Sequence, residues 1–389
     1  MVRARVDTVL ADPRIQRAFR FISQKESEIE ADQIRLTGIP APPFQEAERA
    51  RAFSQELGTL GLHPSIDSAG NVFAAYEAAG SNPVIVDAHL DTVFPASTPL
   101  HLRRKAKVLF MPGISDNGSG IVALVWALRA AKEAGLRFRR PVIAVGSVGE
   151  EGEGNLRGVR HLFSAPPWGG RDCEFIALDG GGLHCIANQG LGSRRFRVVM
   201  RGPGGHSWAD FGRPNPIEAI ATAIHKFSTG RPGRASGSSF NFGIVRGGIS
   251  VNAIPSEASI EVDLRSIVSA HLGDLERQLS RAVSEAAGAT GVEFQIEQTG
   301  ERPLGVTPST SGLLQAAAET TRRFDVEPRF EVGSTDANIP MSMGIPAIAI
   351  GGGGASGNIH TPEEWFDPVH RDLGIQRLLA LVAVLAELE

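Results

Sequence analysis

Short apolar runs rich in β-branched residues alternate with longer helical patterns over the first half of the chain. Three of these runs cover residues 83–88, 141–148 and 175–178. Continuous apolar runs of this length are typical of strands that are buried on both faces of a sheet. Residues 71–76 are predicted to form a further strand. The pattern therefore predicts an α/β fold.

Apolar residues at helical spacing fill much of the sequence between these runs. We expect helices within residues 12–62, interrupted by the Pro-rich segment 37–43, and over residues 121–131, 311–324 and 371–388. Residues 121–131 are almost wholly apolar, so this helix should be buried on most sides. The helix over 371–388 is predicted to be amphipathic. With a short buried strand at 347–350, these elements make up a three-layer α/β domain.

The pattern changes near Ser193. Residues 257–265 alternate strictly between apolar and polar, which is typical of a half-exposed antiparallel strand. The other elements predicted in this block are strands at 195–201, 240–245 and 292–296 and helices at 214–228 and 272–287. The order β-α-β-β-α-β is that of a split βαβ sandwich. We therefore expect a discontinuous catalytic domain of residues 1–192 and 305–389, interrupted by an inserted ferredoxin-like lid domain at 193–304.

Composition and charge exclude several classes of protein. The 389-residue chain is 42% hydrophobic and 21% charged, as in globular proteins, and its net charge of -4 gives no electrostatic footprint for nucleic acid. The charged N-terminus leads into no apolar segment of the kind found in secretory signals, and no apolar run approaches the roughly 20 residues of a membrane helix. Cys173 and Cys185 are the only cysteines, so we expect no disulfide framework and a cytoplasmic location.

Acidic and imidazole side chains follow the predicted strands where each strand ends. His89 and Asp91 come after the first of the three runs, Glu150 and Glu151 after the second, and Asp179 after the third. In open α/β sheets, functional groups gather beyond the carboxyl ends of the strands. We therefore expect these side chains to share one site.

Two further candidates complete a set of side chains suited to two metal ions. Asp116 opens a helix through the segment Asp-Asn-Gly-Ser-Gly, and His360 lies in a Gly-rich segment near the C-terminus. Zinc binds imidazole nitrogen and carboxylate oxygen, and two ions about 3.5–4 Å apart can share a carboxylate and a hydroxide. Such a site needs two histidines, about three ligand carboxylates and one carboxylate as base. The side chains that supply this set are His89, His360, Asp116, Glu151, Asp179 and Glu150. Asp91 is suited to orient the His89 imidazole.

Each of these signals has a plainer explanation when it is taken alone. A His-x-Asp triplet is common, and an adjacent Glu pair usually belongs to a solvated loop. An Asp before Asn-Gly-Ser-Gly is most often a helix cap or a turn residue. His360 alone can equally be a core or turn histidine. The prediction of a two-metal site therefore depends on the order of the residues and on their placement at strand ends.

The motifs resemble, over nearly the whole chain, those of the M20 metallopeptidases, which include peptidase T-like tripeptidases, carboxypeptidase G2-like enzymes and acyl-amino-acid deacylases. The segments that carry the resemblance are Gly38-Ile-Pro-Ala with Glu46, His89-Leu-Asp91-Thr, Gly113-Ile-Ser-Asp116, Glu150-Glu151-Gly, Asp179-Gly-Gly, Gly202-Pro-Gly-Gly-His206-Ser, Asn252-Ala-Ile-Pro, Asp263-Leu-Arg265 and His360-Thr-Pro-Glu. As a set they are highly specific.

This resemblance implies a division of roles. One zinc ion is held by His89 and Asp179, the other by Glu151 and His360, and Asp116 bridges both. Cobalt or manganese can substitute for zinc. Glu150 is implied to be the general base, and Asp91 to orient His89.

The resemblance also gives roles to the inserted block. Three of its residues are implied to contact the substrate: His206, Asn252 and Arg265. The histidine would come from the partner subunit of a homodimer formed through the lid domains. The plainer explanation of Arg265 is a salt bridge at a strand end. The plainer explanation of His206 is a structural role in a turn.

Two features favour a peptidase within this superfamily. After Asp116 the chain continues Asn117-Gly-Ser-Gly, whereas many deacylases have Met-Lys-Gly, and Asp179-Gly-Gly resembles the peptidase T-like branch. We expect a zinc-dependent exopeptidase of the tripeptidase type, in which a hydroxide between the ions attacks the amide of a small peptide. A deacylase of N-acyl amino acids is the alternative. A non-catalytic binding or scaffold member of the fold is a remote third, because no ligand and no base is missing.

Overall fold

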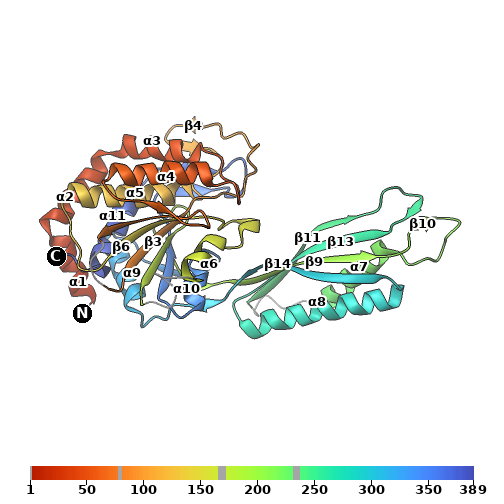
Figure 1. Ribbon diagram of the computed structural model, residues 1–389. Helices are drawn as coiled ribbons and strands as arrows, with labels where there is room; N and C mark the ends of the chain where they lie inside the picture. The colour runs from red at the N-terminus through yellow and green to blue at the C-terminus, as the bar shows by residue number, and fades with distance from the viewer. Residues whose placement is uncertain (1, 78–80, 165–171, 231–236) are drawn as a thin grey trace. The chain divides into compact units, whose positions relative to one another are not determined.

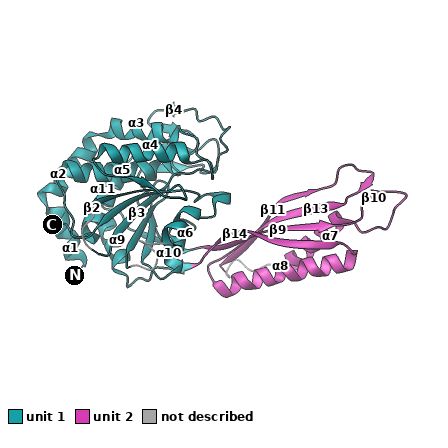
Figure 2. Ribbon diagram, in the orientation of Figure 1, with its two compact units in different colours: residues 1–190, 305–389 teal, residues 191–304 magenta. Residues whose placement is uncertain are grey.

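The chain divides into two compact units (Figure 2). The computed structural model describes residues 2–77, 81–164, 172–230 and 237–389. Unit 1 consists of Met1–Gly190 and Gly305–Glu389, and unit 2 of Leu191–Leu304. The boundaries expected from the sequence, 193 and 304, lie within two residues of the boundaries of unit 2. Each unit has its own hydrophobic core and is described by itself.

Unit 1 is built on a mixed sheet that has nine strands within the described residues, in the order β1-β2-β6-β3-β7-β17-β8-β15, with β16 also paired to β8. These strands are β1 (Ser65–Ile66), β2 (Val72–Glu77), β3 (Val84–His89), β6 (Val142–Ser147), β7 (Glu174–Leu178), β8 (Cys185–Gly190), β15 (Gly305–Val306), β16 (Arg329–Gly333) and β17 (Ala347–Ile350). β3 pairs in parallel with β6 and β7, and β17 pairs in parallel with β7. The carboxyl ends of these four strands therefore meet at one edge of the sheet.

Helices cover both faces of this sheet (Figure 1). They are α1 (Val2–Ala11), α2 (Pro13–Gln24), α3 (Glu26–Thr37), α4 (Ala47–Thr59), α5 (Gly118–Glu133), α6 (Arg157–Ser164), α9 (Gly312–Arg322), α10 (Asn338–Ser342) and α11 (Arg371–Leu385). Val84 and Val86 of β3 pack on one face into the core that contains α5 and α11, and Ile85 packs on the other face with α6 and α10. The layers confirm the predicted three-layer α/β fold.

Two helix predictions have different outcomes. α5 is confirmed as a buried helix, since nearly every residue from Gly118 to Ala131 is buried. The prediction that the C-terminal helix is amphipathic is wrong. α11 is buried along almost its whole length, because α1, α2, α5 and α9 all pack against it. A helix that is enclosed by other helices has no face exposed to solvent, so its sequence needs no polar face.

A second, small sheet in unit 1 is not evident from the sequence pattern. Its strands, in spatial order, are β18 (Ala355–Gly357), β19 (Trp365–Asp367), β5 (Val108–Phe110) and β4 (Arg103–Lys105). All neighbours pair antiparallel. The loop between β18 and β19 and the loop between β5 and α5 both leave this sheet, so it sets the position of both loops.

The described part of unit 2 is an antiparallel sheet in the order β11-β13-β9-β14 with two helices. Its elements are β9 (Gly192–Arg201), β10 (Gly205–His206), α7 (Pro216–Thr229), β11 (Ser238–Gly247), β12 (Ala253–Ile254), β13 (Glu257–Ser266), α8 (Ser269–Thr290) and β14 (Glu293–Arg302). Apart from the short β10–β12 pair, the order is the predicted β-α-β-β-α-β, and the strand order is ferredoxin-like. In neither unit does a described helix have the length and apolar character to cross a membrane.

Candidate metal centre

Three of the parallel strands bring their candidate side chains to one place. β3 ends at His89, Glu150 and Glu151 follow β6, and Asp179 follows β7 directly. His89, Glu150 and Glu151 are buried, and Asp179 is half-buried. The shared carboxyl edge explains why residues far apart in the sequence meet here.

The other two candidates come from the small sheet. Asp116 lies in the loop between β5 and α5 and is buried. His360 lies in the loop between β18 and β19, in the left-handed region with a φ of 65°, and its side chain is about half exposed. The sequence could not show that these two loops start from one sheet.

These side chains form two groups that share Asp116. In the first group, His89 Nε2 lies 3.1 Å from Asp116 Oδ1 and 3.8 Å from Asp179 Oδ1. In the second, His360 Nε2 lies 3.1 Å from Asp116 Oδ2 and 3.0 Å from Glu151 Oε1. The ligand atoms within each group all lie within 4.8 Å of one another. Each oxygen of Asp116 therefore faces a different group, as a bridging carboxylate requires.

The residues fit two divalent cations. Ligand atoms 2.0–2.1 Å from a tetrahedral ion lie about 3.3 Å apart, and the spacings here bracket that value. Two buried atoms, His89 Nε2 and Asp116 Oδ1, have no hydrogen-bond partner among the described residues, although they face each other. The His89 Nδ1 atom lies 3.2 Å from the carbonyl oxygen of Asp91. With Nδ1–H donating to that carbonyl, Nε2 presents its lone pair to the group.

The charges of the first group also favour a cation. Burial lowers the pKa of His89, but the nearby carboxylates of Asp116 and Asp179 outweigh burial and hold it well above its ordinary value. Burial raises the pKa of Asp116, yet His360 and His89 hold it below its ordinary value.

In the second group, hydrogen bonds to Asp116 and Glu151 raise the pKa of His360 to about 10. The carboxylates of both groups therefore favour positive charge at the two histidines. A bound cation supplies that charge in place of protons.

Asp91 contacts both the loop that follows β6 and the imidazole of His89. Its carboxylate oxygens accept hydrogen bonds from the backbone N–H groups of Glu150 and Glu151, at 2.9 and 2.8 Å. The nearer carboxylate oxygen lies 3.8 Å from His89 Nδ1, so the imidazole is closer to the backbone carbonyl of Asp91. Asp91 thus links the end of β3 to the loop that follows β6.

Three buried residues at the site were given no functional role from the sequence. Glu364 accepts hydrogen bonds from the N–H groups of Gly113, Ser115 and Asp116, and burial raises its pKa to about 7 against the effect of these three donors. Asp336 lies against Ser147 at the end of β6, and Asn117 follows Asp116. Glu364 directly follows the motif His360-Thr-Pro-Glu. None of the motifs in the sequence contains Asp336.

The lid candidates lie in unit 2, apart in the sequence from the groups above. His206 and Asn252 are exposed, and the two segments that carry them are joined where Ser207 N–H donates to the Asn252 carbonyl. Arg265 Nε donates to Asp263 Oδ2 at 2.6 Å, which agrees with the plainer explanation of this residue. The described part of unit 2 contains no group of metal-type ligands.

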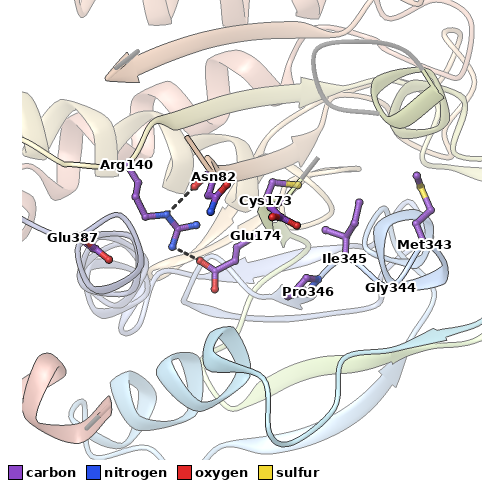
Figure 3. Close-up of a pocket in the computed structure, with 10 residues that line it drawn as sticks. Asn82, Arg140, Cys173, Glu174, Met343, Gly344, Ile345, Pro346 and Glu387 are labelled. Atoms are coloured by element: carbon purple, nitrogen blue, oxygen red, sulfur yellow. Dashed lines mark hydrogen bonds and ion pairs between the residues drawn. The ribbon is translucent and has the colours of Figure 1, made fainter. Parts of the chain in front are cut away.

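A hollow at the opposite end of the strands belongs to a different part of the sheet (Figure 3). It is lined at the amino ends of the parallel strands, by Asn82, Glu174 and Pro346 among others. The guanidinium of Arg140 there donates to Glu174 and to the carbonyls of Asn82 and Leu385. This charge already has partners, and no candidate of the metal centre lies among the lining residues.

Comparison with known proteins decides the family. The model of peptidase family M20/M25/M40 matches residues 85–388. The chain belongs to this family. It is therefore a member of a family of hydrolytic enzymes, as its motifs indicated, and the match covers residues 85–190 and 305–388 of unit 1 and all of unit 2.

Individual proteins are similar at low identity. The uncharacterized protein YgeY of Escherichia coli (strain K12) is 27% identical over 144 residues, which are 34% of this chain and only 36% of YgeY. A tripeptidase from Staphylococcus aureus subsp. aureus Mu50 has a TM-score of 0.77 at 20% identity, over 93% of this chain and 98% of that one. The YXEP protein of Bacillus subtilis, a dinuclear metal-binding peptidase of the M20 family, has a TM-score of 0.70 at 16% identity, over 94% and 99%. These structures show the shared fold.

Proposed function

We propose that this chain is a zinc-dependent exopeptidase that hydrolyses amide bonds of small peptides, with tripeptides as its substrate class. The observation that carries the proposal is the pair of ligand groups that share Asp116. His89 and Asp179 would hold one ion, Glu151 and His360 the other, and Asp116 both. Two bound ions supply Lewis acidity, since they lower the pKa of water and polarise a carbonyl.

Glu150 is the proposed base, because it is a buried carboxylate directly before the ligand Glu151 and belongs to neither ligand group. The hydrogen bonds from the N–H groups of Glu150 and Glu151 to Asp91 fix the backbone of this pair. In an extended segment, adjacent side chains point in opposite directions, so Glu151 can bind an ion while Glu150 faces the water. Glu150 would take the proton from the attacking water and pass it to the leaving amine.

The lid residues are proposed to act on the substrate. His206 would donate to the developing oxyanion, Arg265 would bind the carboxylate of a free C-terminus, and Asn252 would contact the substrate. An enzyme that recognises the free C-terminus of its substrate would select short substrates. We propose that the protein is located in the cytoplasm.

A homodimer through the lid domains is part of the same proposal. Around His206, four apolar side chains are almost fully exposed: Trp208 (87%), Phe211 (91%), Ile249 (96%) and Val251 (103%). β11 forms one edge of the sheet within the described part of unit 2. Exposed apolar groups and an open strand edge mark surfaces that associate with other chains.

A substrate panel tests the proposal. Zinc-loaded protein is incubated with tripeptides, dipeptides and N-acetyl amino acids, and the released amines are quantified. Tripeptides should be the best substrates, and chelation should abolish turnover until zinc or cobalt is restored. Turnover of N-acetyl amino acids alone would make the chain a deacylase. Active protein without divalent metal would overturn the two-metal proposal.

A further inference from the structure

Asn117 directly follows Asp116, the ligand that both groups share, and its side chain has unusual hydrogen-bond partners for its position. Asn117 is the N-cap residue of α5, and Asn is among the best residue types for this position because its side chain accepts from the first turn. The Asn117 side chain makes no such hydrogen bond. It is fully buried, so its amide must find partners elsewhere.

Those partners flank the first ligand group. Asn117 Nδ2 donates to the carbonyl oxygen of Leu178 at 2.8 Å and lies 3.4 Å from the carbonyl oxygen of His89. The N–H of Gly180 donates to Asn117 Oδ1 at 3.2 Å. Leu178 and Gly180 are the residues on either side of Asp179. One side chain thus contacts the backbone of one ligand and of both neighbours of another.

A glycine in α5 makes room for this arrangement. A Cβ atom on Gly120 would lie 2.2 Å from Asn117 Oδ1 and 2.9 Å from the carbonyl oxygen of Leu178. Any side chain at 120 would therefore displace Asn117 from the end of β7. This explains the glycine at a position inside a helix, where glycine normally destabilises the helix relative to alanine.

α5 holds Asn117 in place. The carbonyl of Asn117 accepts from the N–H of Ile121, and the helix that follows is buried against the sheet. Asp116, which carries the shared carboxylate, directly precedes Asn117 in the chain. The distances from Asp116 to His89 and to Asp179 are therefore fixed by one rigid element and three hydrogen bonds.

We propose that Asn117 is a positioning residue that sets the geometry of the ion site formed by His89, Asp116 and Asp179, and that Gly120 is required for this role. The inference depends on the proposed function in one respect, that ions bind at this site. The hydrogen bonds of the Asn117 side chain all go to the backbone of His89 or of the neighbours of Asp179, so the ion at Glu151 and His360 should depend on it less.

The test measures metal binding in place of hydrolysis. Cobalt stoichiometry and visible absorption are recorded for the wild type, Asn117→Asp, Asn117→Leu and Gly120→Ala, with circular dichroism and thermal unfolding of each metal-free protein. Groups that orient ligands typically contribute 10–100-fold in metal affinity. The three variants should fold, lose this amount at one ion and retain the other. Asn117→Asp, which keeps the acceptor for Gly180, should lose least. Asn188→Asp, in β8, makes the same chemical change away from the site and should bind two ions.

Double variants distinguish a positioning role at one ion from a general loss of structure at the whole metal centre. Combining Gly120→Ala or Asn117→Leu with Asp179→Asn should cost little more than Asp179→Asn alone, because both changes act on one ion. Combining either with Glu151→Gln should remove both ions. Equal loss of both ions in the single variants, or affinities within threefold of the wild type, would overturn the inference. Gly120→Ala leaves Asn117 intact, so it decides the matter if a substitution at 117 prevents folding. A wild-type chain that binds fewer than two ions would instead overturn the proposed function.

Discussion

Two adjacent glutamates carry different proposed roles. Glu150→Gln removes the base but leaves both ligand groups intact, so the protein should bind two ions and fold normally. Turnover should fall about 10²–10⁴-fold, the usual contribution of general acid–base catalysis. Glu151→Gln should instead lower the occupancy of the ion at Asp116 and His360. Elemental analysis and kcat distinguish the two variants.

Glu153→Gln is the matched control, because Glu153 is exposed in the same loop. It should retain both ions and normal turnover. A near-normal kcat for Glu150→Gln would show that another group takes the proton.

Asp87 and Asp336 are two buried acids that both contact Ser147. Ser147 Oγ lies 2.8 Å from Asp336 Oδ2 and 3.1 Å from Asp87 Oδ2, but a hydroxyl can donate only one hydrogen. Burial raises the pKa of Asp87 to about 6. Burial, then the charges of Asp87 and Glu150, raise the pKa of Asp336 well above its ordinary value. The pair must therefore keep a proton in the folded protein.

This proton links stability to pH. A carboxyl whose pKa is raised by folding destabilises the folded state as the pH rises above its unfolded pKa, about 3.9 for Asp. Asp336→Asn removes that linkage and supplies an N–H for Asp87. The metal-free variant should therefore gain stability relative to the wild type between pH 5 and pH 8, as measured by urea unfolding. Asp274→Asn, at an exposed position, should show no such trend, and a parallel trend in both variants would exclude a shared proton.

At the scale of elements, Glu364 joins two ligand-bearing loops. It ends the loop that carries His360 and accepts three N–H groups from the loop that carries Asp116. Glu364→Gln places an amide NH₂ against one of these donors and leaves it unsatisfied. We expect a lower melting temperature and about 10–100-fold weaker binding of the ion at Asp116, Glu151 and His360. Zinc competition with a chelator measures this.

The preceding residue provides the control. Glu363 is exposed and pairs with Arg103 at 2.6 Å, so Glu363→Gln should change neither property. Unchanged zinc affinity in Glu364→Gln would show that the loops are held together by the small sheet alone.

The elements that the sequence predicted well are those with strong periodicity. The buried runs that end before His89, Glu150 and Asp179 are strands whose parallel pairing follows from the α/β pattern. The short strands β4, β5, β18 and β19 were not predicted, because three residues carry no periodic signal. The convergence of Asp116 and His360 depends on this small sheet, and it could be inferred only through family resemblance. The roles of Asn117 and Glu364 depend on hydrogen bonds across long sequence separations, which no local pattern records.

At the scale of the whole molecule, the candidate residues divide between two units. The ligand groups and Glu150 lie in unit 1, and His206 lies in unit 2. If His206 donates to the oxyanion, His206→Ala should lower kcat about 10²–10³-fold, the usual cost of removing such a donor, and leave metal content unchanged. His225→Ala, an exposed histidine in α7, is the control and should be fully active. A loss of bound metal in His206→Ala would contradict a role limited to the substrate.

The proposed dimer predicts that the histidine works across the interface. Mixing His206→Ala protomers with Glu150→Gln protomers gives heterodimers in which one site has a native Glu150 and receives a native His206 from the partner. The other site lacks both. Random exchange should therefore restore activity at about a quarter of all sites, although each parent is inactive. Native mass spectrometry establishes that heterodimers form. If they form without activity, His206 serves its own chain or has no catalytic role, and the apolar surface around it joins two independent sites.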